Sequence, residues 1–252
     1  MTTALGLVGG KLAGILVSRF RTLALERLSK YRQEAFVETL SDRFRDELFH
    51  GESEEAVERL LDDMLKKEAL AEAVFDAFRR VSLSRSREIG PRIIGYLTAG
   101  ILAEDRLATE DEERWFDAAE SMSDFELLTL VQTFEDWNEQ ADQGQIDFRS
   151  DNLGVGMEVD HQAMDDSRQG RIESSGLTGG MDPWMRKLAV LGLVYERTLD
   201  QRKRYEADTD RGIDEPFSQR TMTWWLVISK EVVPLIELIK RADTAKKARL
   251  MV

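Results

Sequence analysis

Apolar side chains recur at steps of three and four residues along much of this chain, and this spacing restricts the possible folds more than any other feature. Residues 12–48 follow the pattern without proline and, after Gly14, without glycine. A second run begins after Ser53, which is typical of an N-cap before Glu54 and Glu55. Because this period matches the 3.6-residue turn of an α-helix, the sequence predicts a mostly α-helical fold, a multi-helix bundle.

Further helix starts are visible in the middle of the chain. Gly90-Pro91 opens a helix with proline in its first turn, and Thr109 precedes three acidic residues as the N-cap of the next one. Ser123-Asp124 opens a third. The predicted order is helix, acidic turn, helix, short turn, helix.

Composition divides the chain into four segments. They are a basic, glycine-striped N-terminal helical segment (1–52), a helical core (53–140), a polar insertion (141–182) and a C-terminal helical segment (183–252). The insertion is rich in Gly, Asp, Ser and Gln, and it is predicted to form a loop or a partly β structure with a short helix from Asp160 to Ser174. In the last segment, a helix is expected from Asp182-Pro183 to Leu199. The final apolar run, residues 217–240, should be kinked or broken at Pro234.

Residue counts exclude several classes of function. The chain has no cysteine and two histidines, so thiolate metal sites, disulfides and thiol nucleophiles are excluded, and a zinc site or a Ser-His-Asp triad is disfavoured. A net charge of −13 argues against nucleic-acid binding. The sequence contains no convincing signal peptide, so we expect a cytoplasmic protein.

Positive charge is concentrated at the two ends. Residues 1–32 carry a net charge of +5 and residues 239–252 a net charge of +4, so the part between them carries −22. Basic ends of this kind either fold back onto the acidic body or bind something anionic elsewhere.

Residues 102–120 hold eight carboxylates and are called here the acidic hairpin. A hard cation such as Ca²⁺ or Mg²⁺ needs several converging oxygens, and Glu104, Asp105 and Glu112 can supply some of them. The alternatives are an acid/base pair, or acidic side chains that face water and favour the positive end of a helix dipole.

The stretch "YLTAGILAEDRLATEDEERWF", an apolar helix followed by an acidic turn, a threonine cap and an acidic helix start, resembles the core of TerB-like domains. This family of helical domains is linked to tellurite resistance and to stress or phage-defence gene clusters. The resemblance covers about residues 55–140, and it implies metal binding at Asp105 and at Glu112 or Glu113. Arg106 departs from the family pattern, in which glycine usually follows the turn aspartate.

Near the N-terminus, Gly6, Gly10 and Gly14 repeat every four residues and would form one small-residue stripe on a helix. With Arg19 and Arg21 beyond it, this segment could lie on an anionic membrane surface, at the inner face of the membrane, or pack against another helix or a second subunit.

The function expected from these features is that of a non-enzymatic helical interaction or regulatory protein, with no catalytic residue assigned. Its partner would be another protein or a second copy in a homo-oligomer, and the family likeness suggests a stress or phage-defence system. Two alternatives stay open. One is a membrane-directed effector acting through the glycine stripe, and the other is a metal-dependent enzyme using the acidic hairpin with Ca²⁺ or Mg²⁺.

Overall fold

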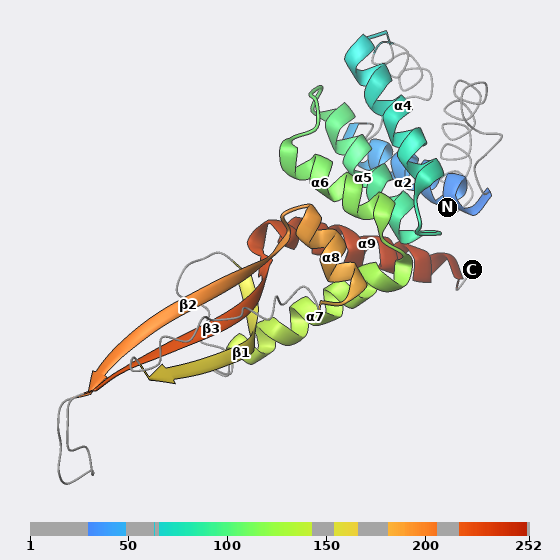
Figure 1. The fold of residues 1–252 in the computed structure, drawn as a ribbon. Coiled ribbons are helices and arrows are strands. Elements are labelled where there is room, and N and C mark those ends of the chain that lie inside the picture. Colours follow the sequence, from blue (N-terminus) through green and yellow to red (C-terminus); the bar gives the residue numbers. More distant parts are fainter. Residues whose placement is uncertain are drawn as a thin grey trace. The chain divides into compact units, whose positions relative to one another are not determined.

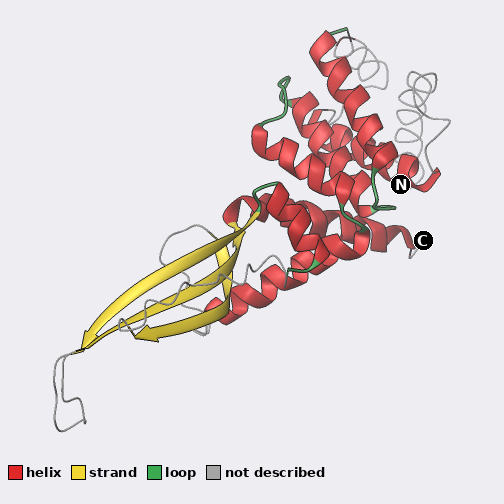
Figure 2. Cartoon of the chain, viewed as in Figure 1, coloured by secondary structure: helices red, strands yellow, loops and turns green. Residues whose placement is uncertain are grey.

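The computed structural model describes residues 30–48, 63, 66–142, 154–165, 181–205 and 217–250. Figures 1 and 2 show its helices and strands. The chain divides into two compact units, residues 1–131 with 234–252 and residues 132–233. The described residues are mostly helical, with one three-stranded antiparallel sheet, which confirms the predicted fold class.

Helices make up the described part of the first unit. They are α2 (Lys30–Leu48), α4 (Glu68–Leu83), α5 (Ile89–Ala103), α6 (Glu110–Ser121), the first part of α7 (Asp124–Asp142) and nearly all of α9 (Val233–Leu250). The starts of α5, α6 and α7 lie where the sequence predicts them.

Helix α5 is the centre of this unit, in contact with α2, α4 and α6. Its side chains are buried on nearly every side, including Ile93, Ile94 and Ile101, as expected of a helix that is apolar all round. Phe36 of α2 and Phe78 of α4 also meet edge to face, with their ring centroids 4.9 Å apart. The core of the bundle therefore surrounds α5.

Helix α9 brings the basic C-terminal end back onto the first unit. One face of the helix is buried, at Leu235, Ile236, Ile239 and Ala242. Lys246 lies 3.3 Å from a carboxylate oxygen of Asp124, and Arg249 donates to Glu34 at 2.5 Å. For residues 239–250, the structure confirms that the basic end folds back onto the acidic body.

The second unit contains the sheet. Strands β1 (Gly154–Asp165) and β2 (Val194–Tyr205) both pair antiparallel with β3 (Phe217–Ser229), and helix α8 (Pro183–Val190) precedes β2. A β-bulge in β1 falls between Glu158 and Asp160. The partly β character predicted for residues 141–182 is confirmed by β1.

The prediction that residues 183–252 form a helical segment is wrong in its middle part. Helix α8 ends at Val190 instead of continuing to Leu199, because Gly192 adopts a left-handed backbone conformation with a φ of 72°. The amide of Leu193 then bonds the carbonyl of Leu188 at 2.9 Å, which closes the helix end before β2 begins.

Two more segments predicted as helix are strand. Residues 160–165 belong to β1, with Asp160 opposite Trp224, so a helix cannot start at Asp160. The run through Trp224-Trp225 forms β3, since β-branched and aromatic residues suit a sheet. Strand β3 ends at Ser229, a 3-10 turn follows (Lys230–Val232), and Pro234 lies in the first turn of α9, where the run changes structure.

Candidate functional site

The turn of the acidic hairpin is a closed helix end. Asp105 has a φ of 52°, and the amides of Asp105 and Arg106 bond the carbonyls of Leu102 and Ile101. This is a Schellman arrangement in which aspartate takes the place usual for glycine, as aspartate tolerates the left-handed region better than most residues. The carboxylate of Asp105 bonds Lys67 from the residues before α4. The turn aspartate thus has a structural role.

Glu112 lies in the first turn of α6 and is nearly buried. Its carboxylate receives hydrogen bonds from both terminal nitrogens of Arg106, at 2.6 and 2.7 Å, and from the amide of Thr109 at 2.8 Å. The Thr109 hydroxyl accepts in return from the Glu112 amide, which completes the capping box predicted from the sequence. Burial acts to raise the pKa of Glu112, but the bonds from Arg106 and Thr109 outweigh it and hold that pKa below its usual value.

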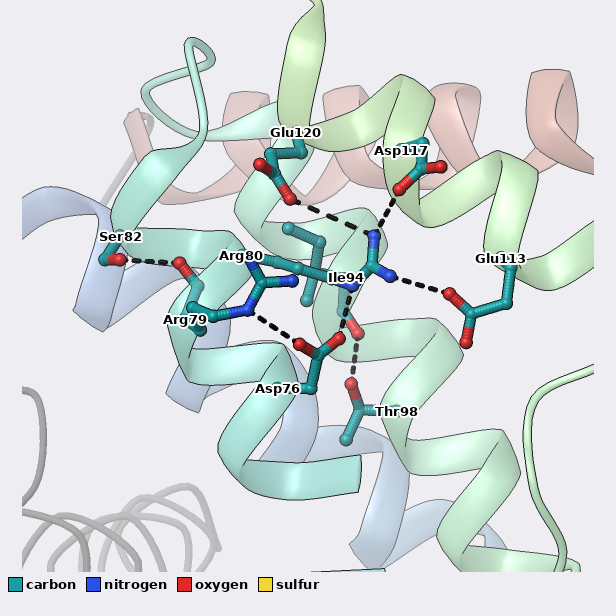
Figure 3. A network of polar contacts seen from close by, with 9 residues as sticks. All are labelled: Asp76, Arg79, Arg80, Ser82, Ile94, Thr98, Glu113, Asp117 and Glu120. Atoms are coloured by element: carbon teal, nitrogen blue, oxygen red, sulfur yellow. Dashed lines mark hydrogen bonds and ion pairs between the residues drawn. The ribbon is translucent and has the colours of Figure 1, made fainter. Parts of the chain in front are cut away.

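Glu113, the next residue, belongs to a different ion-pair cluster, centred on Arg80 of α4 (Figure 3). Arg80 donates to Asp76 at 2.5 Å, to Asp117 at 2.5 Å and to Glu113 at 2.6 Å. Glu120 lies 3.9 Å from the same guanidinium. Arg80 therefore connects α4 to three successive turns of α6.

The Arg80 cluster keeps a negative formal charge. Arg79 also donates to Asp76, at 2.8 Å, so two guanidiniums face the four carboxylates of Asp76, Glu113, Asp117 and Glu120. Burial opposes ionisation of Asp76, yet the bonds from Arg80 and Arg79 lower its pKa. For Glu120, burial prevails and raises the pKa. The surface between α4 and α6 is acidic even with its arginines in place.

The structure does not bring the three predicted metal ligands together. Asp105 bonds Lys67, Glu112 bonds Arg106, and Glu113 bonds Arg80. Among the residues that the structure describes, no group of three acidic or histidine side chains is arranged to hold a metal ion.

The predicted membrane or oligomer site, Gly6, Gly10, Gly14, Arg19 and Arg21, lies outside the described residues. Within the described part of the chain, no helix has the length and apolar character needed to cross a membrane.

Next to the Arg80 cluster, a groove of about 330 Å³ lies between α4 and the acidic hairpin. Most of its lining is apolar, from Ala69, Ala73, Ala77, Ile101, Leu107 and Phe116. Leu107 is 63% exposed, which is high for a large apolar side chain. Glu72, Asp76 and Glu113 also line the groove, and the described lining holds no basic side chain. The groove can therefore accept an apolar side chain together with a neighbouring positively charged group.

Similarity to known proteins does not assign the chain to a family. Protein-family models, curated proteins and solved structures were all searched, and none of them matches the chain. The function is therefore inferred from the geometry of the acidic hairpin and its groove.

The acidic hairpin was predictable from the sequence, whereas the α4 side of the site was not. Arg80 lies on α4, 33 residues before Glu113 and 37 residues before Asp117 of α6, and only the fold brings them together. A sequence pattern that indicates this side lies on α4, where Ala69, Ala73 and Ala77 repeat every four residues. Because alanine side chains are small, this face of the helix leaves space for a groove.

We expect divalent cations to leave the thermal stability unchanged. A cation at the acidic hairpin would have to displace Arg106 from both oxygens of Glu112, and no second carboxylate is free of a basic partner there. Melting curves recorded with chelator and with millimolar Ca²⁺ or Mg²⁺ should therefore coincide. Specific binding would instead raise the melting temperature as ligand concentration increases, and Asp105→Asn should then abolish that rise.

Proposed function

We propose that this chain is a non-enzymatic interaction or regulatory protein that binds a partner protein in the groove between α4 and the acidic hairpin. The observation that carries the proposal is the combination of an apolar lining with exposed Leu107 and three acidic side chains. Apolar contact supplies most of the binding free energy in such sites, and charge complementarity selects the partner.

The chemistry of the hairpin supports binding over catalysis. Glu112 and Glu113 are engaged with arginines, and Asp105 with a lysine. Burial acts to raise the pKa of Glu112, but the bonds from Arg106 and Thr109 outweigh it and lower that pKa, so Glu112 is a poor general acid or base at neutral pH. The same ion pairs fix α4, α5 and α6 in place and so preorganise the groove walls.

The partner segment is expected to present one or two apolar side chains flanked by Lys or Arg. The groove volume of about 330 Å³ is at the lower end of the range for ligand sites, which suits side chains better than a whole cofactor. Glu72 is exposed on α4, and Asp76 and Glu113 belong to a cluster with excess negative charge. A basic residue of the partner can therefore be bound beside the apolar contact.

The likeness of residues 55–140 to TerB-like domains suggests the cellular system in which this interaction takes place. In that proposal, the chain acts within a stress-response or phage-defence system, where a helical module recognises another component of the same system.

Affinity capture from cells that make the protein tests the proposal when wild type is compared with Ala69→Trp. Ala69 is exposed at the groove, so an indole there should block the groove without disturbing the core. We expect a basic partner to be lost or reduced at least about tenfold, which corresponds to 1.4 kcal/mol. Its binding, remeasured with the purified partner, should weaken as salt increases.

Leu83→Trp is the matched control, because Leu83 is exposed on α4 but does not line the groove. A partner retained by this variant and lost by Ala69→Trp supports the proposal, and light scattering shows whether that partner is a second copy of the chain. If every captured protein is retained equally by both variants, the groove is not the binding site.

A further inference from the structure

Residues 1–29, which precede α2 in the chain, are basic. They hold four basic side chains and one acidic side chain, a net charge of +3, and they lie outside the described residues. At the other end of the chain, Lys246 and Arg249 already pair with carboxylates of the first unit. In a chain whose net charge is −13, the basic residues 1–29 are attracted to acidic surfaces of the same chain.

Within residues 1–29, Phe20 stands between Arg19 and Arg21. An apolar side chain with a guanidinium on each side matches the partner chemistry proposed for the groove between α4 and the acidic hairpin. That groove combines exposed Leu107 and a mainly apolar lining with three carboxylates, and its described lining holds no basic side chain. The sequence around Phe20 is therefore complementary to the groove in both polarity and charge.

The start of α2 lies near enough to the groove for this contact. The Arg32 guanidinium donates to the Ser82 carbonyl at 3.3 Å, which places the start of α2 beside the last turn of α4. Ala77, in the groove lining, precedes Ser82 by about 8 Å along the axis of α4. Arg21 lies nine residues before Lys30, and an extended chain of this length spans about 30 Å. This span also covers the path around a helix about 10 Å wide.

We propose that residues 19–21 occupy the groove of their own chain and compete there with the partner protein. The inference rests on the proposed function for the role of the groove, and it adds a means of regulation. A short tether holds a segment at an effective concentration in the millimolar range, so even a weak contact keeps the groove filled. The apparent affinity of the partner is then reduced by the fraction of chains in which the groove is open.

The reaction rate of a single thiol at the groove tests the proposal on the full chain. The chain has no cysteine, so Ala69→Cys introduces one thiol, at an exposed position in the groove lining. Iodoacetamide, which is uncharged, should label this thiol slowly while residues 19–21 occupy the groove. Adding Phe20→Asp should raise the rate at least about tenfold, because it removes the aromatic anchor and places a carboxylate beside an acidic wall.

Two matched controls accompany this measurement. Thr3→Asp introduces the same charge as Phe20→Asp at a distance from the arginines, so it should leave the labelling of Ala69→Cys unchanged. Leu83→Cys places the thiol at an exposed position of α4 outside the groove, next to Ser82 and the start of α2. Its labelling should be the same with and without Phe20→Asp, which also verifies that the variant stays folded.

Arg19→Gln combined with Arg21→Gln keeps the ring of Phe20 and removes its two neighbouring charges, so it tests the contact without removing an apolar side chain. This variant should also speed the labelling of Ala69→Cys, as should potassium chloride, because salt screens the attraction. Equal labelling with the wild-type segment and with both variants would overturn the proposal. Protection that increases with protein concentration would overturn it too, because a second copy would then supply the segment.

Partner capture separates this inference from the proposed function. We expect the Phe20→Asp chain to capture more of the partner than wild type does. An unprotected thiol, together with a partner lost by Ala69→Trp, overturns the intramolecular contact and supports the groove as the binding site. A protected thiol, together with equal capture by wild type, Phe20→Asp and Ala69→Trp, supports the contact and overturns the proposed function.

Discussion

Replacement of Gly90 by alanine is expected to lower the free energy of unfolding by about 2–3 kcal/mol, as overpacking of a close contact does. A Cβ at this position would lie 2.4 Å from the carbonyl oxygen of Ala119 in α6 and 2.7 Å from the Cβ of Ser86. The first of these atoms belongs to the backbone and cannot rotate away. The two helices would have to separate at the point where the start of α5 meets α6.

Gly100→Ala, in the same helix, is the matched control. Apart from its chain neighbours and the backbone of its own helix turn, no described heavy atom lies within 4 Å of a Cβ built at Gly100. Alanine should stabilise the helix there by about 0.5–1 kcal/mol, because glycine loses more backbone entropy on folding. Urea unfolding followed by circular dichroism should thus give changes of opposite sign. A Gly90→Ala protein as stable as wild type would show that α5 and α6 are not this close.

Signals confined to one turn of chain were sufficient to predict the starts of α5, α6 and α7. The capping box from Thr109 to Glu112 needs four residues, and the structure forms it as expected. Pro91 and Asp124 likewise lie at the starts of α5 and α7. These features could be predicted because the interactions that define a helix start are between neighbours in sequence.

Strands β2 and β3, and the strand pairing of β1, were not predicted because the partners are distant in sequence. Asp160 pairs with Trp224, and Thr198 pairs with the same residue from the other side. Nothing within ten residues of Trp224 reveals either pairing. A local signal did exist at Gly192, whose left-handed conformation ends α8, but the apolar spacing beyond it resembled a continued helix.

The site was predictable only in part, for the same reason. The acidic hairpin is continuous in sequence, so its carboxylates were identified directly. Their partners were not, since Arg80 and Lys67 reach the hairpin from α4 and the residues before it. In the same way, Arg92 of α5 bonds Glu38 of α2, which lies 54 residues away in the sequence. Charge that looks unpaired along the chain is paired in space.

Asp124 has a role that its position in sequence does not reveal. It opens α7, but its carboxylate also accepts from the amides of Glu88 and Ile89 at the start of α5, at 3.4 and 3.2 Å. The Ser86 hydroxyl and Lys246 of α9 bond it as well. One carboxylate therefore caps α5 and connects it to α7 and α9.

Asp124→Ala is expected to lower the free energy of unfolding at pH 7 by about 2–3 kcal/mol, the range for breaking a partly buried, charge-assisted network. The amides of Glu88 and Ile89 would lose their acceptor at a helix start, and Lys246 would lose its carboxylate partner. Asp124→Asn, which keeps an acceptor oxygen but loses the charge, should show a smaller loss. Asp111→Ala is the control at an exposed helix start and should change stability by less than about 0.5 kcal/mol.

The effect of Asp124 should also depend on pH, with a sign that follows from its pKa. Burial acts to raise the pKa of Asp124, but the hydrogen bonds from Ser86 and Ile89 outweigh it and lower that pKa in the folded chain. A carboxyl with a depressed pKa stabilises the fold fully above its unfolded pKa of about 3.9, and this contribution is lost as pH falls through the folded value. The stability difference between wild type and Asp124→Ala should therefore be constant from neutral pH to about pH 5 and should narrow below about pH 4. A difference that instead widened on acidification would show that the protonated carboxyl, and not the carboxylate, holds α5, α7 and α9 together.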